Sequence, residues 1–92
     1  MSEEFNTLIK NFDKAIQKKE KGKFDKSDVK EIYKAASDLF DGEKQLDQKQ
    51  KEQIRDRWVT LAPEKIDKGS AMAKLQGTSR AEAIQSVLLS SI

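Results

Sequence analysis

The sequence predicts an all-α protein: a small bundle of four main helices, with a short irregular or helical segment before the last helix. Three observations predict this class. Apolar residues recur at positions i, i+3, i+4 and i+7, which gives each helix one apolar stripe. The single proline and the four glycines separate these periodic segments. No run of β-branched or aromatic residues alternates with period two, so no strand is predicted. We expect residues 1–92 to form one helical domain, because the chain is near the lower size limit for independent folding.

The first helix is expected over residues 2–21. Ser2 is its expected N-cap, and Glu3 and Glu4 suit the positive end of the helix dipole. Gly22 is expected to end the helix. The apolar stripe consists of Phe5, Leu8, Ile9, Phe12, Ala15 and Ile16.

The second helix is expected to begin after Asp25, which can serve as its N-cap. Phe24 and Val29 flank this start with the spacing of a hydrophobic staple. Gly42 is expected to end the helix. Its apolar stripe consists of Val29, Ile32, Tyr33, Ala36, Leu39 and Phe40.

The third helix is expected to begin with a capping box formed by Asp47 and Gln50. Leu46 is expected to pack at the start of this helix, and Pro63 is expected to end or kink it. The predicted buried face consists of Ile54, Trp58, Leu61 and Ala62.

The stretch from residue 63 to residue 76 is expected to form one or two short helices, divided at Gly69-Ser70. Thr78 or Ser79 is expected to cap the last helix, and Ser79 with Glu82 has the spacing of a capping box. Its apolar face is expected to pack on the core of the same chain. The alternative is a partner-binding surface formed by Ile84, Val87, Leu88, Leu89 and Ile92.

The composition excludes several kinds of chemistry. The chain has no cysteine, which excludes disulfides and zinc-thiolate sites. It has no histidine, which removes the commonest general base and metal ligand. We therefore expect no enzyme, no catalytic residue, no metal site and no cofactor. No segment approaches the roughly 20 apolar residues of a membrane span, and the acidic N-terminus does not have the pattern of a targeting signal. The expected location is the cytoplasm.

The sequence contains one basic cluster, made of Lys18, Lys19, Lys21, Lys23 and Lys26. Such a cluster could bind phosphates. It contains no arginine, however, and a net charge of +2 gives little electrostatic attraction for nucleic acid. A small nucleic-acid-binding regulatory domain is therefore the least favoured of three functional hypotheses.

Three fragments together resemble the acyl-CoA-binding protein family. The segment LQGTSRAEAI is similar to the L-K-G-T-S-K-E-x-A-M of that family, and YKAAS is similar to its Y-K-Q-A-T. The pair Arg57-Trp58 follows YKAAS at about the distance of a Lys-Trp pair in the family. The resemblance implies a carrier of acyl-CoA or another amphipathic ligand, in which Tyr33, Lys34 and Arg57 contact adenine and phosphates. Independently of the family, an arginine beside a partly exposed Trp58 would suit a planar anion or a carboxylate.

The leading hypothesis is a non-enzymatic helical module for protein–protein interaction, whose partner is another protein or a second copy of the chain. It follows from the absence of catalytic residue types and phosphate loops, and from the apolar last helix. The acyl-CoA carrier is the second hypothesis.

Overall fold

The computed structural model of the chain describes residues 3–42, 46–62, 66–77 and 79–90. Five helices and no strand occur in these residues, which confirms the all-α prediction. The helices are α1 (Glu3–Glu20), α2 (Lys26–Gly42), α3 (Gln48–Leu61), α4 (Lys68–Lys74) and α5 (Arg80–Leu89). The expectation of four main helices is thus inexact, because the segment before the last helix contains a regular fifth helix. In the described part of the chain, no helix has the length and apolar character needed to cross a bilayer.

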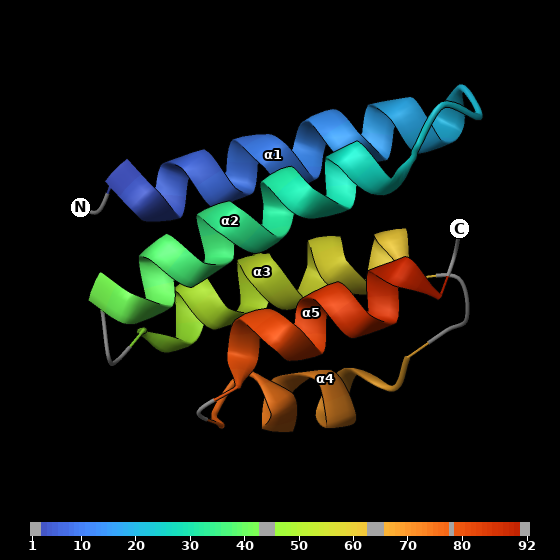
Figure 1. Cartoon of the computed structure of the whole chain (residues 1–92). Coiled ribbons are helices and arrows are strands. Elements are labelled where there is room, and N and C mark those ends of the chain that lie inside the picture. Colours follow the sequence, from blue (N-terminus) through green and yellow to red (C-terminus); the bar gives the residue numbers. More distant parts are fainter. Residues whose placement is uncertain (1–2, 43–45, 63–65, 78, 91–92) are drawn as a thin grey trace.

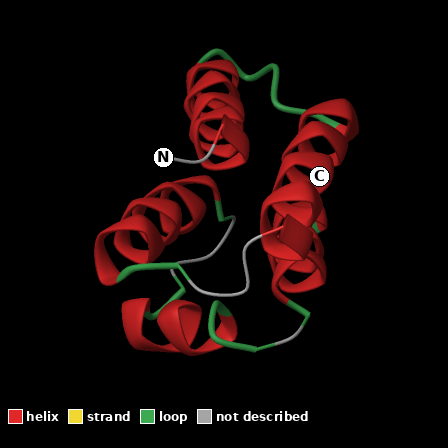
Figure 2. Ribbon diagram, turned by 90° about the vertical axis from the view of Figure 1, so that its left-hand side faces the viewer, coloured by secondary structure: helices red, strands yellow, loops and turns green. Residues whose placement is uncertain are grey.

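The helices are arranged around α1 and α2, which lie side by side as an antiparallel hairpin (Figure 1). Helix α1 also packs against α3, helix α2 packs against α5, and α4 packs against α3. In the view turned by 90°, α1 lies at the top and α4 at the bottom of the molecule (Figure 2). Because of this arrangement, α1 has one neighbour on each flank and an outward side that no other described helix covers.

Side chains from all parts of the bundle meet in one apolar core. The largest buried side chain is that of Trp58, which is completely shielded from solvent. The other fully buried large side chains are Leu8, Phe12, Val29, Ile32, Leu39, Ile54, Leu61, Leu75, Ile84 and Leu88. Leu46 is buried at the start of α3, as the sequence predicted.

The turn between α1 and α2 follows the predicted signals. Helix α1 ends at Glu20, and Gly22 adopts a φ of 70°, a conformation that a residue with a Cβ rarely adopts. Asp25 caps α2, because its Oδ1 accepts hydrogen bonds from the backbone N–H of Ser27 at 3.0 Å and from the Ser27 hydroxyl at 2.6 Å. The predicted cap of α1, Ser2, lies outside the described residues.

The start of α2 also contains a capping box that the sequence analysis did not identify. The Asp28 Oδ2 accepts a hydrogen bond from the backbone N–H of Asp25 at 3.0 Å, three residues before it. Glutamate or glutamine normally fills this position, so the motif was not evident with an aspartate.

Helix α3 begins with the predicted capping box. The Gln50 N–H donates to the Asp47 Oδ1 at 2.7 Å, and the Asp47 N–H donates to the Gln50 Oε1 at 3.1 Å. At the other end, Lys19 of α1 donates from Nζ to the Leu61 carbonyl oxygen at 2.9 Å. A cation from a neighbouring helix therefore satisfies the C-terminal carbonyl group of α3, where the helix dipole favours positive charge. Pro63 lies outside the described residues.

One predicted boundary and one predicted capping box are wrong. Gly69 and Ser70 do not divide two helices, because both lie in the first turn of α4, where the Asp67 Oδ2 accepts the Ser70 N–H at 3.0 Å. Ser79 does precede α5, but its side chain makes no capping hydrogen bond. Its backbone has φ −105° and ψ 43° instead of the extended conformation typical of an N-cap, so the capping box with Glu82 does not form. Thr78 lies outside the described residues.

Candidate functional site

Trp58, which the sequence analysis placed both on the buried face of the third helix and in the ligand-binding set, belongs to the core. Its side chain has no exposed surface, and its indole Nε1 has no hydrogen-bond partner among the described residues. A tryptophan can stack on a ligand only where one face of its ring is open. In this conformation Trp58 therefore stabilises the bundle and offers no platform for a ligand.

The remaining predicted ligand residues do not come together. Arg57 extends from α3 to α1, where its Nε donates to the Asp13 Oδ1 at 2.8 Å. Tyr33 is half-buried against the core, and Lys34 lines a hollow between α1 and α2. Since α1 contacts α2 and α3 on different flanks, Lys34 and Arg57 are directed to separate surfaces. The structure therefore does not bring Lys34 and Arg57 together beside one hollow.

The predicted partner-binding residues of α5 do not form one exposed face either. Ile84 and Leu88 have no exposed surface, which leaves them unable to contact a partner in this conformation. Val87 is half-buried, whereas Leu89 is 40% exposed. Two helical residues that are two positions apart differ by about 200° in direction, so Val87 and Leu89 lie on opposite sides of the buried stripe. Ile92 lies outside the described residues.

The basic cluster is partly used inside the fold. Lys18 Nζ lies 2.9 Å from the Asp28 Oδ1, and Lys19 binds the end of α3. The hydrogen bond and charge of Asp28 raise the pKa of Lys18 above its ordinary value. Lys21, Lys23 and Lys26 remain exposed around the turn between α1 and α2. Two of the five charges are therefore neutralised or occupied by contacts within the chain.

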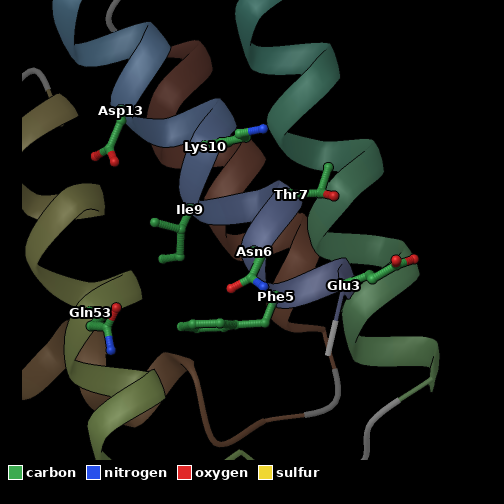
Figure 3. A pocket seen from close by; sticks show the side chains of 8 residues that line it. All are labelled: Glu3, Phe5, Asn6, Thr7, Ile9, Lys10, Asp13 and Gln53. Atoms are coloured by element: carbon green, nitrogen blue, oxygen red, sulfur yellow. The ribbon is translucent and has the colours of Figure 1, made fainter. Parts of the chain in front are cut away.

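The clearest concave surface is a groove between α1 and α3, with a volume of about 590 Å³. Phe5 and Ile9 project from α1 toward α3, and Gln53 faces them from α3 (Figure 3). Asn6 lies on the outward side of α1, and Asp13 forms the end of the groove. We call this surface the α1–α3 groove. Its floor is apolar, its rim is polar, and it is widely open to solvent.

On its other flank, α1 borders a second concave surface, which we call the α1–α2 groove. It consists of two hollows of about 390 Å³ and about 150 Å³, which share Thr7, Ala35 and Asp38. The smaller hollow is also lined by the carboxylates Glu3 and Glu4, and the larger by Asn11, Lys14, Glu31 and Lys34. The two ends of this groove therefore differ in charge.

The exposed positions of α1 between the two grooves form a single line. Glu3, Thr7, Lys10 and Lys14 are all exposed, and they follow one another at spacings of four, three and four residues. This spacing keeps them within about 60° of one another around the helix. We call these four residues the α1 ridge. Their spacing was visible in the sequence as the complement of the apolar stripe, but the grooves beside them depend on where α2 and α3 pack.

The described residues offer no evident site for a metal ion, since no three acidic side chains among them come together in a suitable cluster. No family model matches the chain, and no curated protein or solved structure matches it. The candidate site is therefore defined by its geometry alone: the α1 ridge with a groove on each side.

Proposed function

We propose that the protein is a non-enzymatic helical module that binds another protein chain through the α1 ridge and the two grooves beside it. One observation carries this proposal: the outward side of α1 is flanked by concave surfaces of about 590 Å³ toward α3 and about 390 Å³ toward α2. Helical partners commonly dock into shallow grooves between helices with apolar floors and polar rims. The proposal places the protein in the cytoplasm, as expected from its sequence.

The shape of the grooves favours a protein segment over a small molecule. Pockets for small ligands enclose most of the ligand between apolar walls. In the α1–α3 groove, by contrast, Phe5 and Ile9 form only the floor, and the rim consists of polar side chains such as Asn6 and Gln53. Protein interfaces combine such a small apolar centre with a polar rim.

The same surface has few features that would support catalysis. The chain contains neither histidine nor cysteine. The ion pair of Arg57 with Asp13, a residue that lines the groove, joins α3 to α1 at 2.8 Å and so has a structural role. A binding function requires only the shape and charge of the surface, both of which the described residues provide.

Site-specific photo-crosslinking in the native host tests this proposal. A benzoylphenylalanine is introduced at Asn6 or Gln53, which border the α1–α3 groove, and at Ser86, an exposed residue of α5, as the matched control. We expect a defined protein adduct at the two groove positions and none at Ser86. The partner is then identified by mass spectrometry and its binding is reconstituted from purified components. Equal labelling at all three positions, or no adduct at the groove, would contradict the proposal.

The acyl-CoA carrier and the nucleic-acid-binding domain stay predictions, and no feature of the described residues favours either of them. A titration with acyl-CoA followed by Trp58 fluorescence tests the first, and a salt series with DNA and RNA tests the second. Saturable binding at micromolar acyl-CoA, or affinity that falls steeply with salt, would support these alternatives over the present proposal.

A further inference from the structure

We infer that the partner on the α1 ridge is a second copy of the same chain, bound in the antiparallel direction about a two-fold axis. This inference rests on the proposed function and specifies its partner. In a two-fold dimer the same patch is used by both copies, so residue i contacts residue j and j contacts i. The patch must therefore be complementary to a second copy of itself that runs in the opposite direction.

The spacing of the α1 ridge satisfies this condition. Positions 3, 7, 10 and 14 follow one another at intervals of four, three and four, which read the same in both directions. In an antiparallel copy, Glu3 then lies opposite Lys14, and Thr7 lies opposite Lys10. The two-fold axis passes between Thr7 and Lys10, about 8 Å along the helix from either end of the ridge.

The charges at the two ends of the α1 ridge are also complementary when one ridge is reversed against the other. The ridge begins with a carboxylate at Glu3 and ends with an ammonium group at Lys14, and both side chains are exposed. The adjoining α1–α2 groove changes in the same direction, from an acidic smaller hollow to a larger hollow in which acidic and basic residues balance. The charged residues that line its smaller hollow are Glu3, Glu4 and Asp38, all of them acidic, whereas its larger hollow contains Lys14 and Lys34 beside Glu31 and Asp38.

The parallel arrangement of two ridges is disfavoured by the same charges. It would place Glu3 beside Glu3 and Lys14 beside Lys14 across the interface, which is destabilising. The antiparallel arrangement also aligns the two α1 dipoles in opposite directions. Thr7 and Ala35 are short side chains where the two hollows meet, so they permit close approach near the middle of the groove.

The physical character of this interface predicts its strength. The ridge itself carries no large apolar side chain, and exposed ion pairs are screened by salt. We therefore expect a weak, reversible dimer that dissociates as ionic strength rises. An obligate dimer would require a larger apolar surface.

Charge reversal combined with sedimentation equilibrium at low salt tests the inference. Glu3→Lys and Lys14→Glu each place like charges together twice in the dimer, so each should raise the dissociation constant about tenfold. Mixing the two variants in equal amounts should restore association, because the ammonium group introduced at position 3 of one chain then faces the carboxylate introduced at position 14 of the other.

Two charge reversals away from the ridge serve as matched controls. Glu82→Lys also reverses an acidic residue in the first turn of a helix, and Lys30→Glu reverses an exposed lysine of α2. Both should leave the dissociation constant unchanged, and circular dichroism should show all variants folded.

Each outcome decides between the alternatives. A dimer that responds equally to the ridge variants and the controls, or a mixture that does not reassociate, would overturn the antiparallel arrangement. A monomer at all concentrations would overturn the inference entirely. If that monomer still gives a groove-specific adduct with a different protein, the proposed function stands without it. If it gives no adduct, both fail.

Discussion

Lys18 and Asp28 join the end of α1 to the start of α2, with the Lys18 Nζ 2.9 Å from the Asp28 Oδ1. Asp28 is only 3% exposed, and its other oxygen accepts the backbone N–H of Asp25. One carboxylate thus caps a helix and forms the ion pair between two helices. We expect it to be among the most important polar groups for stability.

Asp28→Ala should lower the free energy of unfolding by about 2 kcal/mol, since it removes a cap and a charge-assisted hydrogen bond together. Lys18→Met should lower the free energy of unfolding by a smaller amount. The Lys18 side chain is 38% exposed, so water can take its place beside Asp28. Urea denaturation of both variants measures the difference. A larger loss for Lys18→Met than for Asp28→Ala would contradict this role of Asp28.

The stability should fall at acid pH through Asp25. The hydrogen bond from the Ser27 side chain, supported by backbone N–H groups, lowers the pKa of Asp25 below its ordinary value of 3.8. A lowered pKa in the folded state contributes stability above the unfolded pKa, and that contribution is lost as pH falls through the folded pKa. Thermal melts from pH 6 to pH 2 measure this loss of stability. Asp25→Asn keeps a good capping side chain without a titrating group, so its stability should decline less over this range.

The stability should also fall at strongly alkaline pH through Lys18. Its pKa is raised above the ordinary 10.5, chiefly by the hydrogen bond to Asp28. A raised pKa contributes stability that is complete below the unfolded pKa and is lost as pH rises through the folded pKa. Denaturation between pH 9 and pH 12 should therefore show a decline that Lys18→Met lacks. Parallel curves for the two proteins would count against the ion pair.

Two glycines should respond in opposite ways to alanine. Gly22→Ala should destabilise the protein by about 1 kcal/mol, because φ is 70° there. Gly42→Ala should stabilise it by up to about 1 kcal/mol, because Gly42 is helical and an added Cβ would have no atom within 4 Å. Melting temperatures of the two variants provide the comparison. A loss of stability in Gly42→Ala would show that α2 needs glycine at its end.

Two neighbouring leucines of α5 should differ sharply. Leu88→Ala should lower the free energy of unfolding by about 3 kcal/mol, since Leu88 is fully buried in the core. Leu89→Ala should change it by less than about 0.5 kcal/mol, since Leu89 is 40% exposed. Chemical denaturation distinguishes the two. Equal losses would mean that Leu89 is also covered, for example by another molecule.

The helices were predictable where local signals decide them. The Asp47–Gln50 capping box, the Asp25 cap and the stop at Gly22 depend on residues within one turn, and all three are observed. The division at Gly69 and the capping box at Ser79 were wrongly predicted, although α5 does begin directly after Ser79. The capping box formed by Asp25 and Asp28 was missed because its second residue is an aspartate, where glutamate or glutamine is usual.

Most of the candidate site could not be predicted from the sequence. The periodicity of α1 showed which of its residues face away from the core, including Glu3, Thr7 and Lys14. It did not show that hollows border these residues on both sides, because that depends on the positions of α2 and α3. Of the residues proposed as ligand contacts, Trp58 lies in the core, as the helix periodicity also predicted, and Arg57 forms an ion pair.

The helical character of the chain and most helix boundaries could be predicted from local sequence, because hydrogen bonding and capping within a helix involve residues close in sequence. Which neighbours each apolar or charged side chain contacts depends on how the helices pack against one another. Leu88 became core and Leu89 surface, and Lys19 came to cap a helix end 42 residues away. The physical reason is that burial and pairing depend on contacts between helices, and the position of one helix against another is not encoded in the period of either.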